Sequence, residues 1–231
     1  MPPRDPAILK WWPTTQSIDL VEGQIDAIAA AVRFEVERYT EGERFICEWR
    51  RFISFDEALC SADYFASVPT IFVVMPTASK WVAIWNNSFL CNGHYALCHN
   101  LTRRHGFTTM HWSAHDQPTT FQSAATFIHM RREGAEILTR SVHVGQDRGR
   151  WEFHEAGQAL PEEDVSGYLK RLKRDRLNES RVLDLLRNLG ARPWSEDFYD
   201  FAASASNVLR RPQLPEAIQL SKRSRAEMVI R

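Results

Sequence analysis

The sequence predicts an α+β fold in which helices cover a mainly antiparallel sheet of about six strands. Short runs of alternating apolar residues follow one another with tight turns between them, which favours antiparallel strands. Other stretches repeat their apolar residues every three or four positions, which is typical of amphipathic helices. The chain has 231 residues, of which 44% are hydrophobic, and this is enough to bury one large core or two small ones.

The first element expected is a helix over Ser17–Tyr39, because apolar residues recur there at helical spacing. Ser17 is suited to cap its free amide groups, and Glu41-Gly42 ends it. A strand is expected over residues 45–49, where apolar and polar residues alternate. The capping box that begins at Ser54 then predicts a short helix to about Ala66.

The central region reads mainly as strands. Residues 70–75 and 80–85 predict a hairpin, and the short turns within 124–155 predict a three-stranded meander. Between them, a helix is expected to start by Asn92 and to end at Gly106, followed by a strand over residues 108–114. Two further helices fit the next region. The first buries Val165, Tyr168, Leu169 and Leu172, and the second buries Val182, Leu185, Leu186 and Leu189 behind a cap at Asn178.

We expect an N-terminal tail over residues 1–16, one α+β domain over 17–202 and a basic, flexible tail over 203–231. Between Phe201 and Arg231 there are six basic and two acidic side chains, together with two prolines. The segment also has little aromatic content, so we expect it to be disordered or to fold on a partner.

The composition narrows the classes of partner and compartment. Twenty-nine basic residues balance 29 acidic ones, so no overall field attracts nucleic acid or an anionic membrane. The first residues, MPPRDPAILKWWPTT, lack the apolar run of a signal peptide, and no run of about 18 apolar residues predicts a membrane span. We therefore expect a cytoplasmic protein. Four cysteines are too few for a disulfide framework in a chain of this size.

All eight histidines lie between His94 and His154. Four of them fall in proposed strands, and we expect these to share one face of the sheet: His111, His129, His143 and His154. Imidazoles are good ligands for zinc or iron, but no carboxylate or cysteine recurs beside these histidines at a ligand spacing. The Cys91, His94 and Cys98 triplet also lacks a fourth ligand. No metal site and no cofactor is predicted.

An enzymatic alternative rests on Cys91, which stands at the entrance of the helix expected near Asn92. A thiol there feels the helix dipole and has a lowered pKa. His111 or His129 would act as its base, with Asn86 or Asp116 orienting the ring, as in papain-like hydrolases. Against this alternative, the papain cysteine signature is absent, and the apolar neighbours of Cys91 suit a buried thiol.

A nucleic-acid-binding module is the other alternative. The basic side chains that favour it lie close together in the sequence: Lys170, Arg171, Lys173, Arg174 and Arg176. Acidic residues before and within this run dilute its charge: Glu162, Glu163, Asp164 and Asp175. The sequence contains no G-x-G-x-x-G, G-x-x-x-x-G-K-[ST], H-E-x-x-H or G-x-S-x-G motif, so nucleotide-binding and hydrolase folds lose their usual support.

Three motifs carry a resemblance: WNNSFLCNG, GRWEFHEAGQALPEE and RPWSEDFY. Over roughly Trp81 to Tyr199 the chain resembles a group of uncharacterised bacterial proteins, which are similar in size and layout to immunity proteins encoded beside antibacterial toxins. The resemblance implies a protein-binding module that neutralises a toxin from its own gene cluster by occlusion. Four large amphipathic side chains are candidate contacts with such a partner: Trp85, Tyr95, Trp151 and Trp194.

Overall fold

The computed structural model describes residues 17–40, 44–61, 64–65, 71–87, 94–114, 125–202, 205–211 and 218–219. Helices are interspersed among the strands along the chain. In order they are β1 (Ser17–Glu22), α2 (Ile25–Tyr39), β2 (Ile46–Arg50), α3 (Phe55–Cys60), β3 (Tyr64–Phe65), β4 (Ile71–Pro76), β5 (Trp81–Asn86), α4 (His94–His105), β6 (Thr109–Ala114), β7 (Ala125–Glu133), β8 (Glu136–Asp147), β9 (Arg150–Ala156), the 3₁₀ turns η2 (Val165–Leu169) and η3 (Lys173–Asp175), α5 (Glu179–Asn188), the 3₁₀ turn η4 (Glu196–Phe198), β10 (Ser206–Arg210) and β11 (Ile218–Gln219).

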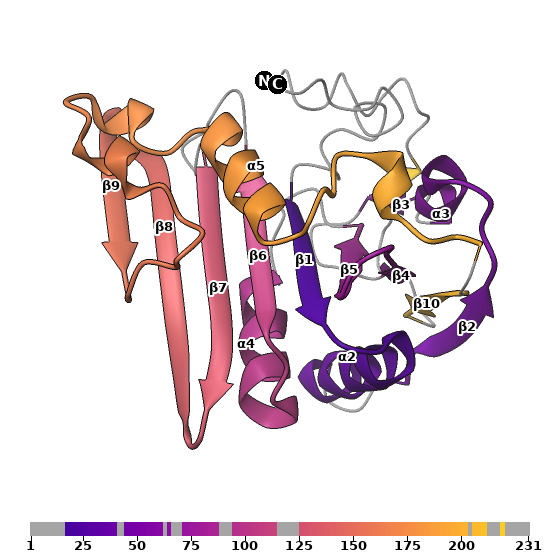
Figure 1. Ribbon diagram of the computed structural model, residues 1–231. Helices are drawn as coiled ribbons and strands as arrows, with labels where there is room; N and C mark the ends of the chain where they lie inside the picture. Colours follow the sequence, from indigo (N-terminus) through magenta and orange to yellow (C-terminus); the bar gives the residue numbers. More distant parts are fainter. Residues whose placement is uncertain are drawn as a thin grey trace.

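The main sheet has nine strands in the order β2-β10-β4-β5-β1-β6-β7-β8-β9, with β2 and β9 at its opposite edges (Figure 1). Every neighbouring pair is antiparallel. The mixed helix and strand content and the antiparallel sheet confirm the fold prediction, but the count of about six strands was too low. The short strands β3 and β11 form a separate antiparallel pair.

Helices cover both faces of this sheet. Apolar residues of α2 and α4 form one core cluster with Val21, Val82 and Ile84, whereas α3 and α5 pack on the opposite face. Figure 1 shows α5 crossing in front of the sheet, with α4 behind it. Glu35, buried on α2, lies 3.0 Å from Nε2 of His105 and so ties α2 to α4.

The expected helix over Ser17–Tyr39 was wrong in its first third, because Ser17–Glu22 is the strand β1, in the middle of the sheet. Ile18 and Leu20 point into one core, and Val21 points into the other. Apolar residues on both sides of a strand satisfy a helical pattern by coincidence. Helix α2 begins only at Ile25, and Gln24, in the capping position, makes no side-chain cap.

A second strand that the sequence did not predict is β10. It lies within the segment 203–231, where a flexible basic tail was expected, and it pairs with β2 on one side and β4 on the other. Val208 and Leu209 are fully buried, one on each face. Because the strand is only five residues long and only two of these are apolar, the basic composition around it concealed it. The expected N-terminal tail, residues 1–16, lies outside the described residues.

The helix expected from Val165 to Leu172 is also absent; the chain forms the two short turns η2 and η3 there. Of the four side chains expected to be buried, only Tyr168 is. Lys170 leaves η2 in an extended conformation, with φ −59° and ψ 142°, so no continuous helix links the two turns.

The remaining helices and the hairpin match the prediction. Strands β4 and β5 pair as expected, and β7, β8 and β9 form the meander. Ser54 caps α3 by accepting a hydrogen bond from the backbone amide of Glu57, although that helix ends at Cys60 and not near Ala66. Asn178 caps α5 through the amide of Arg181. Among the described residues, no helix is long and apolar enough to cross a membrane.

Candidate interaction surface

The segment that follows β9 exposes aliphatic side chains next to basic ones. Leu169 is 87% exposed, and Val165 and Leu172 are each close to half exposed. Lys170, Arg171 and Leu172, together with Asp175, also line an open pocket of about 600 Å³. We call the surface formed by Val165, Leu169, Lys170, Arg171 and Leu172 the basic turn.

The basic turn carries positive charge that no carboxylate of the described residues neutralises. Lys173, just beyond it, forms an ion pair with Glu152 of β9, and the guanidinium of Arg174 lies 3.7 Å from Asp175. Within the described part of the chain, no carboxylate lies within ion-pair distance of Lys170 or Arg171. Their charges are therefore available to a partner, and a nearby leucine offers it an apolar contact.

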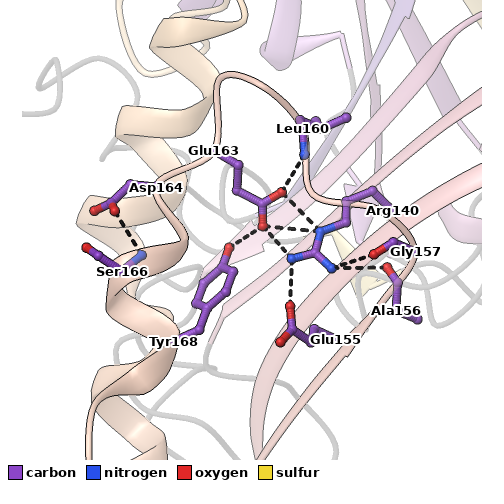
Figure 2. Close-up of polar contacts among 9 residues, drawn as sticks. All are labelled: Arg140, Glu155, Ala156, Gly157, Leu160, Glu163, Asp164, Ser166 and Tyr168. Carbon is purple, nitrogen blue, oxygen red and sulfur yellow. Dashed lines mark hydrogen bonds and ion pairs between the residues drawn. The ribbon is translucent and has the colours of Figure 1, made fainter.

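The basic turn is held by a buried network centred on Arg140 of β8 (Figure 2). The guanidinium donates to both carboxylate oxygens of Glu163, with Nε 3.0 Å from Oε2 and Nη2 2.6 Å from Oε1. Nη2 also donates to Glu155, and Nη1 donates to the carbonyls of Ala156 and Gly157. A planar group with five donors suits this arrangement, in which its partners lie on the neighbouring strand β9 and on the loop that follows it.

Glu163 connects this network to η2. Its carboxylate accepts hydrogen bonds from the Tyr168 hydroxyl at 2.6 Å and from the Leu160 amide at 3.0 Å. Burial opposes ionisation of Glu163, but the hydrogen bonds from Arg140 and Tyr168 outweigh it and hold the pKa of Glu163 below its ordinary value. Burial, together with the bond to Glu163, raises the pKa of Tyr168, so its hydroxyl stays protonated and remains a donor.

A second set of contacts fixes the inner side of η2. Asp164 accepts from the amide of Ser166 with one oxygen and from Arg181 of α5 with the other, both at 3.0 Å. The Tyr168 ring packs against Phe153 of β9, with ring centroids 5.2 Å apart. The inner side of the segment is thus anchored to β9 and α5, while Leu169 is left pointing to solvent.

Gly157 explains why the EAGQALPEE part of the motif needs a glycine. Its φ is +79°, and a Cβ at this position would lie 1.9 Å from the backbone oxygen of Thr139. No side chain fits there, so the loop that leads from β9 to Glu163 depends on this residue. The motif behind the resemblance is therefore, in this part, the structural support of the basic turn.

The four residues predicted to contact a partner differ in how far they are buried. Trp85 and Trp194 are buried in the core, which removes them as contacts with a partner. Trp151 is half-buried and packs against the same core. Tyr95 alone is exposed, at 53%, on α4, where its ring stacks against His99. These tryptophans contribute to the stability of the fold, because burial of a large aromatic ring removes much apolar surface from water.

The histidines do not share one face of the sheet, contrary to expectation. Directly opposed residues of neighbouring strands point to the same face. His129 is opposite Met110 and therefore faces the α5 side, whereas His111, the next residue on β6, faces the α4 side. His143 and His154 oppose each other across β8 and β9, with ring centroids 4.9 Å apart, and lie on the side of His111.

The residues of the enzymatic alternative are only partly described. Cys91 and Asp116 lie outside the described residues. Nδ1 of His111 lies 2.9 Å from Oδ1 of Asp19, a fully buried carboxylate on β1. Burial and the charge of Asp19 raise the pKa of the buried Cys98 thiol, which disfavours the reactive thiolate.

His129, the other candidate base, is buried, and burial with the nearby charges of Arg131 and Lys80 lowers its pKa to about 4. Because His129 and His111 face opposite sides of the sheet, they do not belong to one site. Within the described ranges, no group of three or more histidine, cysteine or acidic side chains is arranged to hold a metal ion.

The sequence analysis placed the residues of the basic turn in a regular helix and therefore missed the surface. Leu169 and Leu172 were assigned to its buried side and the basic residues to its solvated side. Ser166-Gly167 was the available signal, since both residues are poor helix formers and stand in the first turn of the proposed helix.

No protein-family model, curated protein or solved structure matches this chain. The basic turn is therefore interpreted from its chemistry.

Proposed function

We propose that this chain is a protein-binding module of the immunity type, which neutralises a cognate bacterial toxin by covering part of its surface. The observation that carries the proposal is the exposure of Leu169 on a segment that a buried ion pair holds in place. The resemblance to immunity proteins supplies the class of partner.

The energetic argument concerns what the fold leaves unburied. Full burial of a leucine side chain contributes about 1.5–3 kcal/mol, and Leu169 obtains little of this in the isolated chain. The buried pair of Arg140 and Glu163 holds the neighbouring Tyr168 in place through the hydrogen bond from its hydroxyl to Glu163. A preorganised apolar side chain loses little conformational entropy on binding, which favours affinity.

The charge around the leucine indicates the chemistry of the partner. Lys170 and Arg171 directly follow Leu169 in the sequence, and neither is neutralised within the described part of the chain. A partner surface with an apolar pocket and carboxylates at its rim would match both features. A toxin whose active-site region is acidic would be occluded directly by such a contact.

The test uses the full chain and the product of the neighbouring gene, tagged for co-purification and for titration by calorimetry. Leu169→Asp places a charge in the proposed apolar contact and should weaken binding at least about 30-fold, the factor for a loss of 2 kcal/mol at a hot spot. Ile53→Asp is the matched control, because Ile53 is 91% exposed at the other end of the sheet. It should change affinity less than about twofold.

Protection in cells separates occlusion from catalysis. Occlusion requires one chain per toxin molecule and no turnover, so Cys91→Ala should protect as well as the wild type. Substoichiometric rescue that is lost in Cys91→Ala would instead favour the cysteine-dependent hydrolase. Binding of the basic turn to nucleic acid, reduced by Lys170→Glu and Arg171→Glu in the absence of any protein partner, would favour the nucleic-acid-binding alternative.

A further inference from the structure

The strand β2 forms one edge of the main sheet. It pairs with β10 on its inner side, and in the described part of the chain no strand pairs with its outer side. At the opposite edge, η3 packs against β9. An open edge presents unpaired backbone donors and acceptors to another strand. On β2 two large apolar side chains accompany them, since Ile46 and Trp49 are each about half exposed.

Charges alternate along β2 in an order that complements itself. Glu48 and Arg50 point to one face and form an ion pair with each other, while Trp49 points to the opposite face. Both charged side chains remain more than one-third exposed. When such a strand meets a second copy of itself in the antiparallel direction, the order of its charges is reversed.

We propose that two copies of this chain associate through β2, in the antiparallel register that places Trp49 opposite its own counterpart. This register sets Glu48 of each copy opposite Arg50 of the other, so that two ion pairs form across the twofold axis. The two indole rings meet on the other face as a cross-strand aromatic pair. The main sheet then continues through both copies.

The charges select this register among the symmetric ones. Directly opposed side chains point to the same face, so a symmetric pairing is centred on one residue. Centring it on Glu48 would oppose two glutamates, and centring it on Arg50 would oppose two arginines. Centring it on Cys47 would leave both charges of β2 without an opposite charge. A pairing about Ile46 would oppose Glu48 to Arg44, which precedes the strand. Among pairings whose opposed charges all lie within β2, only the one about Trp49 puts unlike charges together twice.

The length of β2 limits the strength of this association. The strand has five residues, so the paired region is smaller than a standard protein interface, and such contacts belong to the weak class. We expect a dissociation constant on the order of 10–100 µM, with monomer and dimer in concentration-dependent exchange. This inference does not depend on the proposed function, because the basic turn lies at the other edge of the sheet.

The experiment is sedimentation velocity on the full chain from about 1 to 500 µM, with charge-reversal variants. Glu48→Arg and Arg50→Glu each oppose like charges twice and should remain monomeric across this range. The double variant Glu48→Arg with Arg50→Glu restores both pairs and should dimerise like the wild type. Glu133→Arg, an exposed reversal at the far end of β7, is the control and should also dimerise like the wild type.

Thermal unfolding of each variant checks that the reversals leave the fold intact, which their exposure predicts. A wild-type chain that stays monomeric at 500 µM would overturn the proposal. Single reversals that dimerise with wild-type affinity would overturn it too, and so would a double variant that fails to recover. Each single reversal also breaks the ion pair between Glu48 and Arg50 within one chain. This loss alone does not change the mass of the sedimenting species, so it cannot imitate the expected loss of the dimer.

Discussion

Replacing Arg140 by leucine should destabilise the protein by about 3–5 kcal/mol at neutral pH. The side chain of Arg140 is only 4% exposed and that of Glu163 only 1%, so the substitution leaves a buried carboxylate without its countercharge. Glu163 keeps the amide of Leu160 and the hydroxyl of Tyr168 as donors, which compensates only part of the loss. Removing one member of a buried pair costs more than the pair contributes, because the remaining charge is poorly solvated.

A double-mutant cycle isolates this effect. Arg140→Leu combined with Glu163→Gln removes the buried charge while keeping an acceptor for Leu160 and Tyr168. We expect the double variant to be at least about 1 kcal/mol more stable than Arg140→Leu alone. Urea denaturation followed by far-ultraviolet circular dichroism measures both free energies of unfolding.

The same cycle has a predictable dependence on pH. In the wild type the folded-state pKa of Glu163 lies below its unfolded value, so its contribution is present above about pH 4.3 and is lost as the pH falls through the folded pKa. The difference in the free energy of unfolding between the wild type and Arg140→Leu should therefore become smaller below pH 4. A cost under about 1 kcal/mol at pH 7, or a double variant no more stable than the single one, would refute the account of the network.

Three further predictions concern single side chains. Gly157→Ala should cost about 3 kcal/mol or more, because its Cβ meets a backbone oxygen and its φ is positive, and chemical denaturation should show a lower midpoint. The depressed pKa of His129 should make the free energy of unfolding fall as the pH drops from 6.5 towards 4, since the unfolded chain takes up the proton first. In His129→Leu this fall should be smaller by about 3 kcal/mol. The Cys98 thiol is buried and its pKa is raised, so iodoacetamide should alkylate it only after the half-buried Cys47. Peptide mapping by mass spectrometry gives the order of alkylation, and alkylation of Cys98 first would contradict the prediction.

The elements that could be predicted from the sequence are those whose signals are local. Asn178 caps α5, Gly106 follows the last turn of α4, and short turns define the meander from β7 to β9. Each of these depends on residues within a few positions of one another. Strand β1 was not predicted because it is buried on both faces, and its apolar residues therefore satisfy a helical pattern as well as an extended one.

The candidate surface depends on contacts between distant residues and was not accessible in the same way. Glu163 is 23 positions from Arg140, and no local pattern indicates that the two form an ion pair. Without this pair, an amphipathic helix is a reasonable interpretation of the residues around Leu169. The face of His129 illustrates a different limit, because an error of one residue in strand phase reverses the direction of every side chain.

The two proposed surfaces lie at opposite edges of the same sheet, and this separation constrains how they act together. Nine strands at about 4.8 Å spacing put the edge strands roughly 38 Å apart, so a contact at β2 does not obstruct the basic turn beside β9. Pairing through β2 would place two basic turns at the far ends of an 18-stranded sheet, on the order of 80 Å apart and facing separate partners. Glu48→Arg should then abolish self-association while leaving the affinity for a protein partner unchanged, and Leu169→Asp should do the opposite. A shared loss of both activities in either variant would show that the two edges are coupled, and it would contradict their assignment as independent surfaces.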